Sequence, residues 1–172
     1  MRKHIFQGMI HAPLTENAPA PDDAATAELA QAVERTARQR LGRSLSIRAV
    51  DSGSCNGCEL EIHALNNAFY DLERFGIRFV ASPRHADVLL VTGPLVHNMR
   101  DALERAWRAM PAPKWVVAVG ECAVDGGLFA GSPACVARGI GAAVPVDLHI
   151  LGCPPRPIDL LKGLLALLEA QA

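Results

Sequence analysis

Residues 86–93 of the chain read ADVLLVTG, an apolar run of strand length with no charge between Val88 and Val91. A strand that is apolar at successive positions is typical of a parallel sheet covered by helices on both faces, because neither side of such a strand meets water. The segment 114–120, KWVVAVG, has the same character. Shorter strand-like runs lie at 45–51, 77–80 and 146–152. These runs predict a buried sheet at the centre of the fold.

Helical patterns separate the strand-like runs. Three stretches repeat apolar residues at helical spacing, at 59–75, 98–110 and 157–170. The first is predicted as a single helix that Gly76 ends, with one apolar line formed by Leu60, Ala64, Ala68 and Leu72. Strands that alternate with helices in this way predict an α/β domain with a mostly parallel sheet in three layers.

The N-terminal part has a different composition. Residues 1–22 are predicted as an extended tail, because the stretch up to Asp23 is rich in proline and small polar residues. Residues 23–43 follow as a helix with acidic residues at its start and arginines towards its end. Its thin apolar stripe (Ala25, Leu29, Ala32 and Val33) favours a solvated helix that lies on the domain or on a partner. Residues 44–172 form the predicted main domain.

Composition excludes several classes of protein. Half of the 172 residues are hydrophobic, a fifth are charged, and the net charge is −1. No basic block suggests nucleic-acid binding, and neither a G-x-G-x-x-G motif nor a P-loop suggests a nucleotide site. The first ten residues lack the apolar run of a signal peptide, and no apolar stretch approaches the ~20 residues that span a bilayer. A cytoplasmic, reduced chain is therefore predicted, in which cysteines are ligands or thiols rather than disulfides.

Four of the five cysteines follow predicted strands. Cys55 and Cys58 come after the strand at 45–51, Cys122 after the strand at 114–120, and Cys153 after the strand at 146–152. The carboxyl ends of parallel strands share one edge of a sheet, where ligands commonly bind, so these cysteines are predicted to meet there.

The fifth cysteine, Cys135, has no strand just before it and is predicted to stay outside the site. Four thiolates suit a [4Fe–4S] cluster or zinc, and the surroundings favour the cluster. Glycines near the cysteines leave room for backbone beside the sulfurs, among them Gly57, Gly120 and Gly152. A redox dithiol would explain Cys55 and Cys58 but not the other two.

Three motifs carry a family resemblance: SCNGCELEI (54–62), GECAVDGGLF (120–129) and PVDLHILGCPP (145–155). Together they resemble the small, cluster-bearing subunit of energy-converting membrane-bound [NiFe] hydrogenases and the homologous 20 kDa subunit of respiratory complex I, the NADH-quinone oxidoreductase. The stretch 73–93 is most similar to the formate-hydrogenlyase type. The resemblance, over about residues 45–165, implies a flavodoxin-like fold and one [4Fe–4S] cluster held by Cys55, Cys58, Cys122 and Cys153.

The resemblance also implies partners and a role. A catalytic [NiFe]-type large subunit is expected against the cluster face, with ferredoxin-like iron–sulfur and membrane subunits in the same complex. The chain would be peripheral on the cytoplasmic face of the inner membrane. It has a single C-x-x-C pair and no visible nickel site, so it is expected to relay electrons and to contain no catalytic residues.

Two alternatives stay open. The first is a complex I-like or hydrogenase-related subunit that passes electrons towards quinone. It is the lesser hypothesis, because complex I subunits resembling this chain have adjacent cysteines where Cys55 and Cys58 are spaced, and a proline where Leu151 stands. The second is a zinc-stabilised binding module.

Two acidic residues follow the C-x-x-C motif. Glu59 and Glu61 are predicted in the first turn of a helix, where they would favour its N-terminus electrostatically. Glu61 is equally a candidate for a proton-relay or interface carboxylate. His85 and His97 are predicted to be ordinary polar or interface residues.

Overall fold

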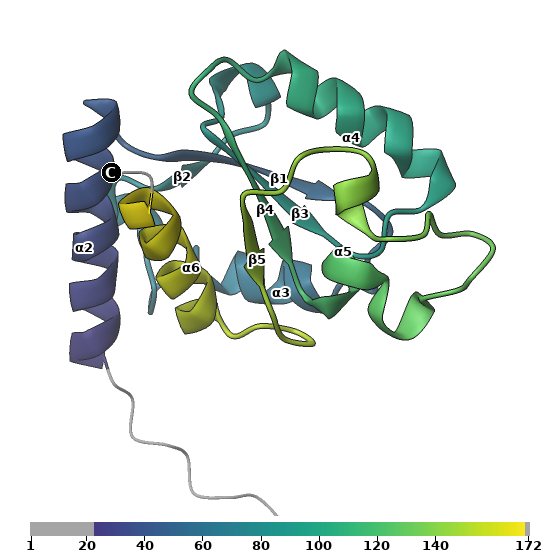
Figure 1. Ribbon diagram of the computed structural model, residues 1–172. Coiled ribbons are helices and arrows are strands. Elements are labelled where there is room, and N and C mark those ends of the chain that lie inside the picture. Colours follow the sequence, from purple (N-terminus) through teal and green to yellow (C-terminus); the bar gives the residue numbers. More distant parts are fainter. Residues whose placement is uncertain (1–22, 171–172) are drawn as a thin grey trace, which may run out of the picture.

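A five-stranded sheet forms the centre of the computed structural model, which describes residues 23–170 (Figure 1). The predicted tail, residues 1–22, lies outside the described residues. All strand pairs in this part of the chain are parallel, and their order is β2-β1-β3-β4-β5. This is the flavodoxin-like order, so the predicted α/β fold with a parallel sheet is confirmed. The strands are β1 (Ser46–Asp51), β2 (Arg78–Phe79), β3 (Val88–Thr92), β4 (Trp115–Val119) and β5 (Leu148–Ile150).

The central strands have two buried faces. Every residue of β3 and β4 is buried. Val88 and Leu90 belong to one hydrophobic cluster, whereas Leu89 and Val91 belong to a second cluster on the other side of the sheet. Side chains of a strand alternate between faces, so an unbroken apolar run supplies both cores at once. The stretch 86–93 therefore determines the layered architecture.

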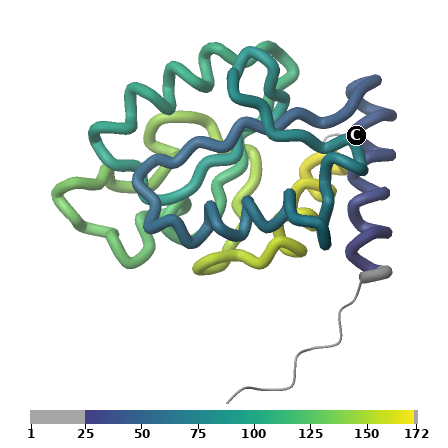
Figure 2. Tube along the Cα trace, turned by 180° about the vertical axis from the view of Figure 1, so that it is seen from behind, coloured from purple at the N-terminus to yellow at the C-terminus, as the bar shows by residue number. Residues whose placement is uncertain are grey.

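Helices cover both faces of the sheet (Figures 1 and 2). The cluster that contains Val88 and Leu90 also holds residues of α2, α3 and α6, and the second cluster holds residues of α4 and α5. The predicted helices at 98–110 and 157–170 are confirmed within a residue. The helices are α2 (Asp23–Leu41), α3 (Gly57–Ala64), α4 (His97–Ala109), α5 (Glu121–Asp125) and α6 (Pro157–Ala170).

The predicted single helix over 59–75 is wrong. Helix α3 ends at Ala64, and a separate 3₁₀ turn spans Leu72–Phe75. Between them the Oδ1 atom of Asn67 accepts hydrogen bonds from the backbone N–H groups of Phe69 (2.9 Å) and Tyr70 (3.0 Å). Asparagine side chains that bond to nearby backbone in this way compete with helix formation. Leu60, which the predicted apolar line placed inside, is 62% exposed on α3.

Helix α2 lies along α6 and contributes to the main core (Figure 1). The helix is present as predicted, but its deepest residues are Ala30, Val33 and Ala37, which are at most 1% exposed. Of the predicted stripe, only Val33 is fully buried, while Ala25, Leu29 and Ala32 are half-buried. Alanines allow two helices to approach closely, so a stripe of small residues can form a tight contact despite its low hydrophobicity.

Replacing Val33 by alanine tests whether α2 belongs to the core. The change removes two buried carbons of a fully buried side chain and is expected to lower the free energy of unfolding by about 2 kcal/mol. Gln31, an exposed residue of the same helix, provides the control, and Gln31→Ala is expected to leave the stability nearly unchanged. Urea unfolding followed by circular dichroism measures both. Equal stabilities of the two variants would show that α2 does not pack on α6 in solution.

Candidate metal centre

Four cysteines line one cavity of about 140 Å³ at the carboxyl edge of the sheet. Cys55 and Cys58 come from the loop after β1 and the first turn of α3, Cys122 from α5 directly after β4, and Cys153 from the loop after β5. The three loops follow β1, β4 and β5. In the sheet, β1 and β4 flank β3, and β5 is next to β4. The predicted meeting of four thiols from three loops is therefore present in the fold.

The remaining cysteine lies apart from this group. Cys135 is half-buried, and its backbone forms an isolated antiparallel bridge with Val96. It is not among the residues that line the cavity of the four cysteines. The loop that carries Cys135 is thus fixed by backbone pairing, and its thiol is not aimed at the cavity by a strand end.

Of the three glycines predicted beside the sulfurs, only Gly120 is required for the position of a cysteine sulfur atom. A Cβ atom at Gly120 would lie 2.8 Å from the Cys58 Sγ atom. At Gly57 a Cβ would make an ordinary contact, 3.6 Å from the Cys55 Sγ atom. At Gly152 it would meet the backbone of Pro155 at 2.7 Å, so this glycine permits the turn after β5.

Side-chain hydrogen bonds hold the loop that carries Cys55. The Oδ1 atom of Asp51 accepts hydrogen bonds from the backbone N–H groups of Gly53 (2.7 Å) and Ser54 (2.6 Å). The Ser54 hydroxyl accepts from the N–H of Asn56 at 3.1 Å and donates to the Glu59 Oε2 atom at 2.7 Å. The loop is therefore tied both to the end of β1 and to the start of α3.

Glu59 also ties this loop to the central strand. The buried hydroxyl of Thr92, at the end of β3, donates a hydrogen bond to the Glu59 Oε1 atom. Both carboxylate oxygens of Glu59 thus accept hydrogen bonds from hydroxyl groups, one from the cysteine loop and one from the sheet. Sequence reasoning assigned Glu59 only an electrostatic role at the helix N-terminus and missed this link. Ser54 five positions before Glu59 was the local signal that could have indicated it.

Glu61 has a different environment. Its side chain is half-buried, does not line the cavity, and makes no hydrogen bond or ion pair with any residue in 23–170. Neither a proton-relay nor an interface role follows from these contacts. His85 and His97 are exposed residues that also lie off the cavity.

The local electrostatics disfavour the thiolate forms of Cys58 and Cys122. Burial, and to a lesser extent the negative charge of Glu59 and the other thiols, raises the pKa of Cys58 to about 12. Burial also raises the pKa of Cys122, against the opposing effect of a hydrogen bond from the Leu128 backbone. A bound cation reverses this preference, because only the thiolate form is a ligand.

The size of the cavity bears on what the thiols could hold. Its volume of about 140 Å³ is comparable to the ~150 Å³ cavity that admits benzene in an engineered protein. It therefore suits a group of several atoms. Within residues 23–170 no set of three or more His, Cys, Asp or Glu side chains is arranged to hold a single metal ion.

Large apolar side chains are exposed around the cysteines. Leu60 follows Cys58 by two positions and is 62% exposed, Leu151 precedes Cys153 by two positions and is 65% exposed, and Leu128 is 92% exposed. Large apolar side chains this exposed, close in sequence to the cysteines, make a candidate interaction surface. We refer to Leu60, Leu128 and Leu151 as the apolar rim.

Within residues 23–170, no helix has the length and hydropathy needed to cross a membrane.

An open parallel sheet with four thiols in one cavity at its carboxyl edge defines a class of small α/β subunit with a candidate metal centre. Residues 55–167 match the family described as NADH ubiquinone oxidoreductase, 20 kDa subunit. This match covers more than half of the chain and includes all four cysteines of the cavity. The chain belongs to this family of oxidoreductase subunits, so the predicted family resemblance is confirmed.

Individual relatives agree with the family match. The chain is 45% identical over 132 residues to a probable membrane-bound hydrogenase subunit, mbhJ, of Pyrococcus furiosus, covering 77% of this chain and 78% of the relative. It is 46% identical over 125 residues to formate hydrogenlyase subunit 7 of Escherichia coli, covering 73% of this chain but only 49% of that relative. The chain thus spans about half the length of the latter protein.

A solved structure supports the same fold. It is that of a membrane-bound sulfane sulfur reductase, described as an archaeal respiratory membrane complex. One of its chains superposes with a TM-score of 0.65 at 34% sequence identity, covering 80% of this chain and 74% of that one.

Proposed function

We propose that this protein is an electron-relay subunit that carries one [4Fe–4S] cluster on Cys55, Cys58, Cys122 and Cys153. The observation that supports this most is the gathering of these four thiols, from three separate strand-end loops, around one cavity. Soft thiolates in a set of four are the usual ligands of such a cluster. A cluster bound there supplies one-electron transfer without bond chemistry.

The chain's own residues provide the remaining requirements of a relay. Gly120 leaves room for the Cys58 sulfur, and the hydrogen bonds of Asp51, Ser54 and Glu59 hold the cysteine loop in one conformation. When the loop that carries a metal ligand is held rigidly, less structural change accompanies each electron transfer. Cys55 and Cys153 are exposed, so the cavity opens towards the surface where a partner can approach.

The apolar rim is the proposed docking surface for a catalytic large subunit. Leu60 and Leu151 each stand two positions from a cysteine of the cavity, and the backbone of Leu128 bonds to the Cys122 sulfur, so a partner that covers these leucines would also shield the cavity from water. We further propose a [NiFe]-type large subunit, ferredoxin-like and membrane subunits in the same complex, and a peripheral position on the cytoplasmic face of the membrane. The spaced Cys55–Cys58 pair and the similarity to hydrogenase subunits over 132 and 125 residues favour this assignment.

A second candidate keeps the relay but changes the catalytic partner. The family is named after NADH ubiquinone oxidoreductase, whereas the similar solved structure is that of a sulfane sulfur reductase. Relatives of this chain therefore belong to complexes with different catalytic activities. The sequence of the neighbouring large subunit separates these candidates. Four nickel-binding cysteines in that subunit would support the hydrogenase, whereas their absence would leave the quinone-directed or another nickel-free complex.

Metal analysis tests the cluster itself. Protein purified without oxygen is expected to contain about four iron and four acid-labile sulfide per chain. One zinc per chain without sulfide would reject the relay and support a zinc-stabilised binding module instead.

Replacing Thr92 by valine tests how Glu59 holds the cysteine loop. Valine keeps the shape of the buried side chain but removes the hydroxyl that donates to Glu59, and such a bond to a charged group is worth about 1.5–3 kcal/mol. We expect iron to be released to a chelator about tenfold faster, together with faster amide hydrogen exchange over residues 54–58. The rate of iron release and mass-spectrometric exchange are the measurements.

The matched control is Thr36→Val. The Thr36 hydroxyl donates at 2.9 Å to the Ala32 carbonyl within α2, away from the cavity. Its removal is expected to change neither measurement. If both valine variants released iron at the wild-type rate, Glu59 would not be holding the loop.

A further inference from the structure

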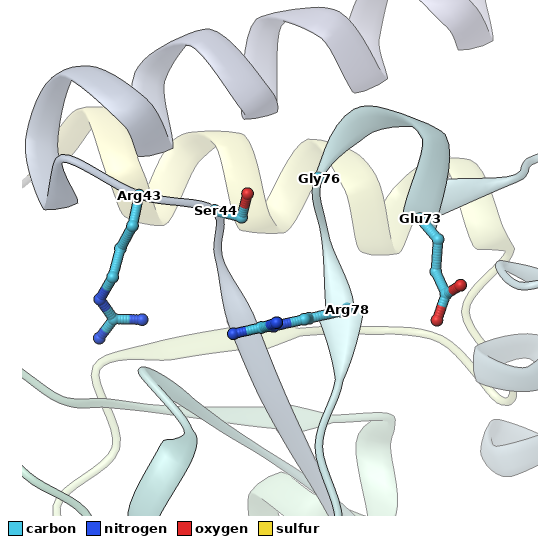
Figure 3. A pocket seen from close by; sticks show the side chains of 5 residues that line it. All are labelled: Arg43, Ser44, Glu73, Gly76 and Arg78. Carbon is cyan, nitrogen blue, oxygen red and sulfur yellow. The ribbon is translucent and has the colours of Figure 1, made fainter.

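A second candidate site lies at the opposite edge of the sheet. Arg43, Ser44, Glu73, Gly76 and Arg78 line a pocket of about 380 Å³ (Figure 3). Ser46 pairs with Arg78 where β1 and β2 begin, whereas the four cysteines follow the other ends of the strands. The pocket is therefore separated from the cluster cavity by the length of the strands.

Arg43 is fixed in position by a buried carboxylate. Its terminal nitrogens donate to both carboxylate oxygens of Asp87, and Asp87 also accepts a hydrogen bond from the Ser46 N–H at 2.9 Å. The Asp87 side chain is 1% exposed, while that of Arg43 is 49% exposed. The guanidinium is thus anchored on its inner side and still presents donors to the pocket.

Arg78 reaches the same pocket from the neighbouring strand. Its Nε atom donates to the Ser46 hydroxyl at 3.3 Å, which lays the side chain across β1. In Figure 3 its guanidinium extends towards that of Arg43, and Glu73 lies on the other side of β2. Among the described residues neither the terminal nitrogens of Arg78 nor the Ser44 hydroxyl has a hydrogen-bond partner.

The backbone keeps this space open. A Cβ atom at Gly76 would lie 2.8 Å from the Ser44 Oγ atom, so almost any other residue there would crowd the hydroxyl. Two guanidinium groups from different segments therefore face one open volume, an arrangement that suits an oxyanion, while the Ser44 hydroxyl points away from them beside Gly76 (Figure 3).

Charge balance selects the kind of anion. Asp87 neutralises Arg43, whereas Arg78 forms no ion pair within residues 23–170, so these three side chains together carry one net positive charge. Glu73 lies on the other side of β2 and is paired with neither arginine in this part of the chain (Figure 3). A carboxylate with a single charge matches this balance better than a doubly charged phosphate does. We propose that this pocket binds the carboxylate of an Asp or Glu side chain from another subunit of the complex. The chain would then have two docking surfaces, the apolar rim at one edge of the sheet and this arginine pocket at the other.

Zero-length cross-linking of the assembled complex tests the proposal. In an Arg78→Lys variant, a carbodiimide activates a nearby carboxylate, and the introduced lysine amine displaces the activated group to form an amide while the carbodiimide leaves as a urea. Mass spectrometry of the digested complex is expected to find the amine at position 78 joined to an Asp or Glu of another subunit. Arg105→Lys is the control, because Arg105 is 80% exposed on α4 and far from the pocket, and its yield is expected to be several-fold lower.

Retention in the complex provides a second measurement. Arg78→Gln removes the uncompensated charge without disturbing the Arg43–Asp87 pair. It is expected to lower the fraction of the chain that stays in the complex after a salt wash about three- to tenfold. Arg105→Gln is expected to have no effect. The cluster's electron paramagnetic resonance signal should be unchanged in both variants, so a failure of the cluster assignment would be seen separately.

Three outcomes would overturn the proposal. In the Arg78→Lys variant the new amine could be joined only to Glu73 of its own chain, or could form links between subunits no more often than the amine of the Arg105→Lys control does. Arg78→Gln could be retained as well as the wild type at every salt concentration. Finally, inorganic phosphate could bind the purified complex saturably in calorimetric titration and lose that binding in Arg78→Gln, which would identify a site for a free oxyanion instead.

Discussion

Replacing Cys58 by serine is expected to abolish the signal of the proposed [4Fe–4S] cluster in electron paramagnetic resonance of the reduced complex. The substitution exchanges a soft thiolate for a hydroxyl, which is a poor iron ligand and stays protonated at neutral pH. Cys58 lies on the inner side of the cavity, where an added Cβ on Gly120 would come within 2.8 Å of its sulfur. The equivalent serine variants of Cys55, Cys122 and Cys153 are expected to lose or convert the cluster as well.

Cys135→Ser is the matched control for this series. Its thiol is half-buried but lies off the cavity, so serine there is expected to leave the cluster signal and electron transfer nearly intact. The cost should be limited to local packing beside Val96. A lost signal in Cys135→Ser together with a preserved signal in Cys153→Ser would overturn the proposed ligand set.

The sheet, and the edge at which the four cysteines meet, could be predicted from the sequence because each depends on strong, local signals. The run from Val88 to Val91 supplies both hydrophobic cores, so its burial is encoded without a break. A parallel arrangement then places all carboxyl strand ends on one side. Any cysteine that directly follows a strand must come to that edge, whatever the details of its loop.

Helix boundaries and contacts were harder to predict because competing local interactions decide them. The apolar spacing over 59–75 fits a helix, but the Asn67 side chain bonds to the following backbone and ends it early. In α2, sequence reasoning gave weight to Leu29, whereas close packing on α6 buries Ala30 and Ala37. Hydrophobicity alone does not reveal which small residues allow two helices to approach.

The role of Glu59 depends on a residue distant in the sequence. Its second hydroxyl partner, Thr92, is 33 positions away and reaches it only because β1 and β3 are neighbours in register, with Asp51 opposite Thr92. No spacing rule within the C-x-x-C motif contains that information. The same register brings the residue after Thr92 against the cysteine loop, which leads to the second large effect.

Replacing Gly93 by alanine is expected to be among the most damaging single changes outside the cysteines. A Cβ at this position would lie 2.4 Å from the backbone nitrogen of Ser54 and 2.6 Å from its Cα atom. These are main-chain atoms of the loop that carries Cys55, so no side-chain rotation relieves the overlap. Either the loop moves away from β3, which disturbs the hydrogen bond between Thr92 and Glu59, or the end of β3 shifts.

Gly131→Ala separates this overlap from the conformational cost of adding a side chain. Gly131 has φ +83°, close to the +75° of Gly93, but a Cβ there would have no atom within 4 Å. Alanine in this left-handed region is expected to cost about 1–2 kcal/mol at either position. The overlap at Gly93 is expected to add about 1–3 kcal/mol. It should also lower the iron content of the purified protein, because the displaced loop carries Cys55 and leads directly into the turn of α3 that carries Cys58.

Urea unfolding and iron analysis of the two alanine variants measure both effects. Loss of iron in Gly93→Ala with full iron content in Gly131→Ala is the expected pattern. Similar stabilities and similar iron contents in the two variants would mean that the Ser54 loop does not rest against Gly93. The contact between β3 and the cysteine loop would then not be what positions Cys55 and Cys58, and the hydrogen bonds of Asp51 to Gly53 and Ser54 would be left as the principal restraint on the loop.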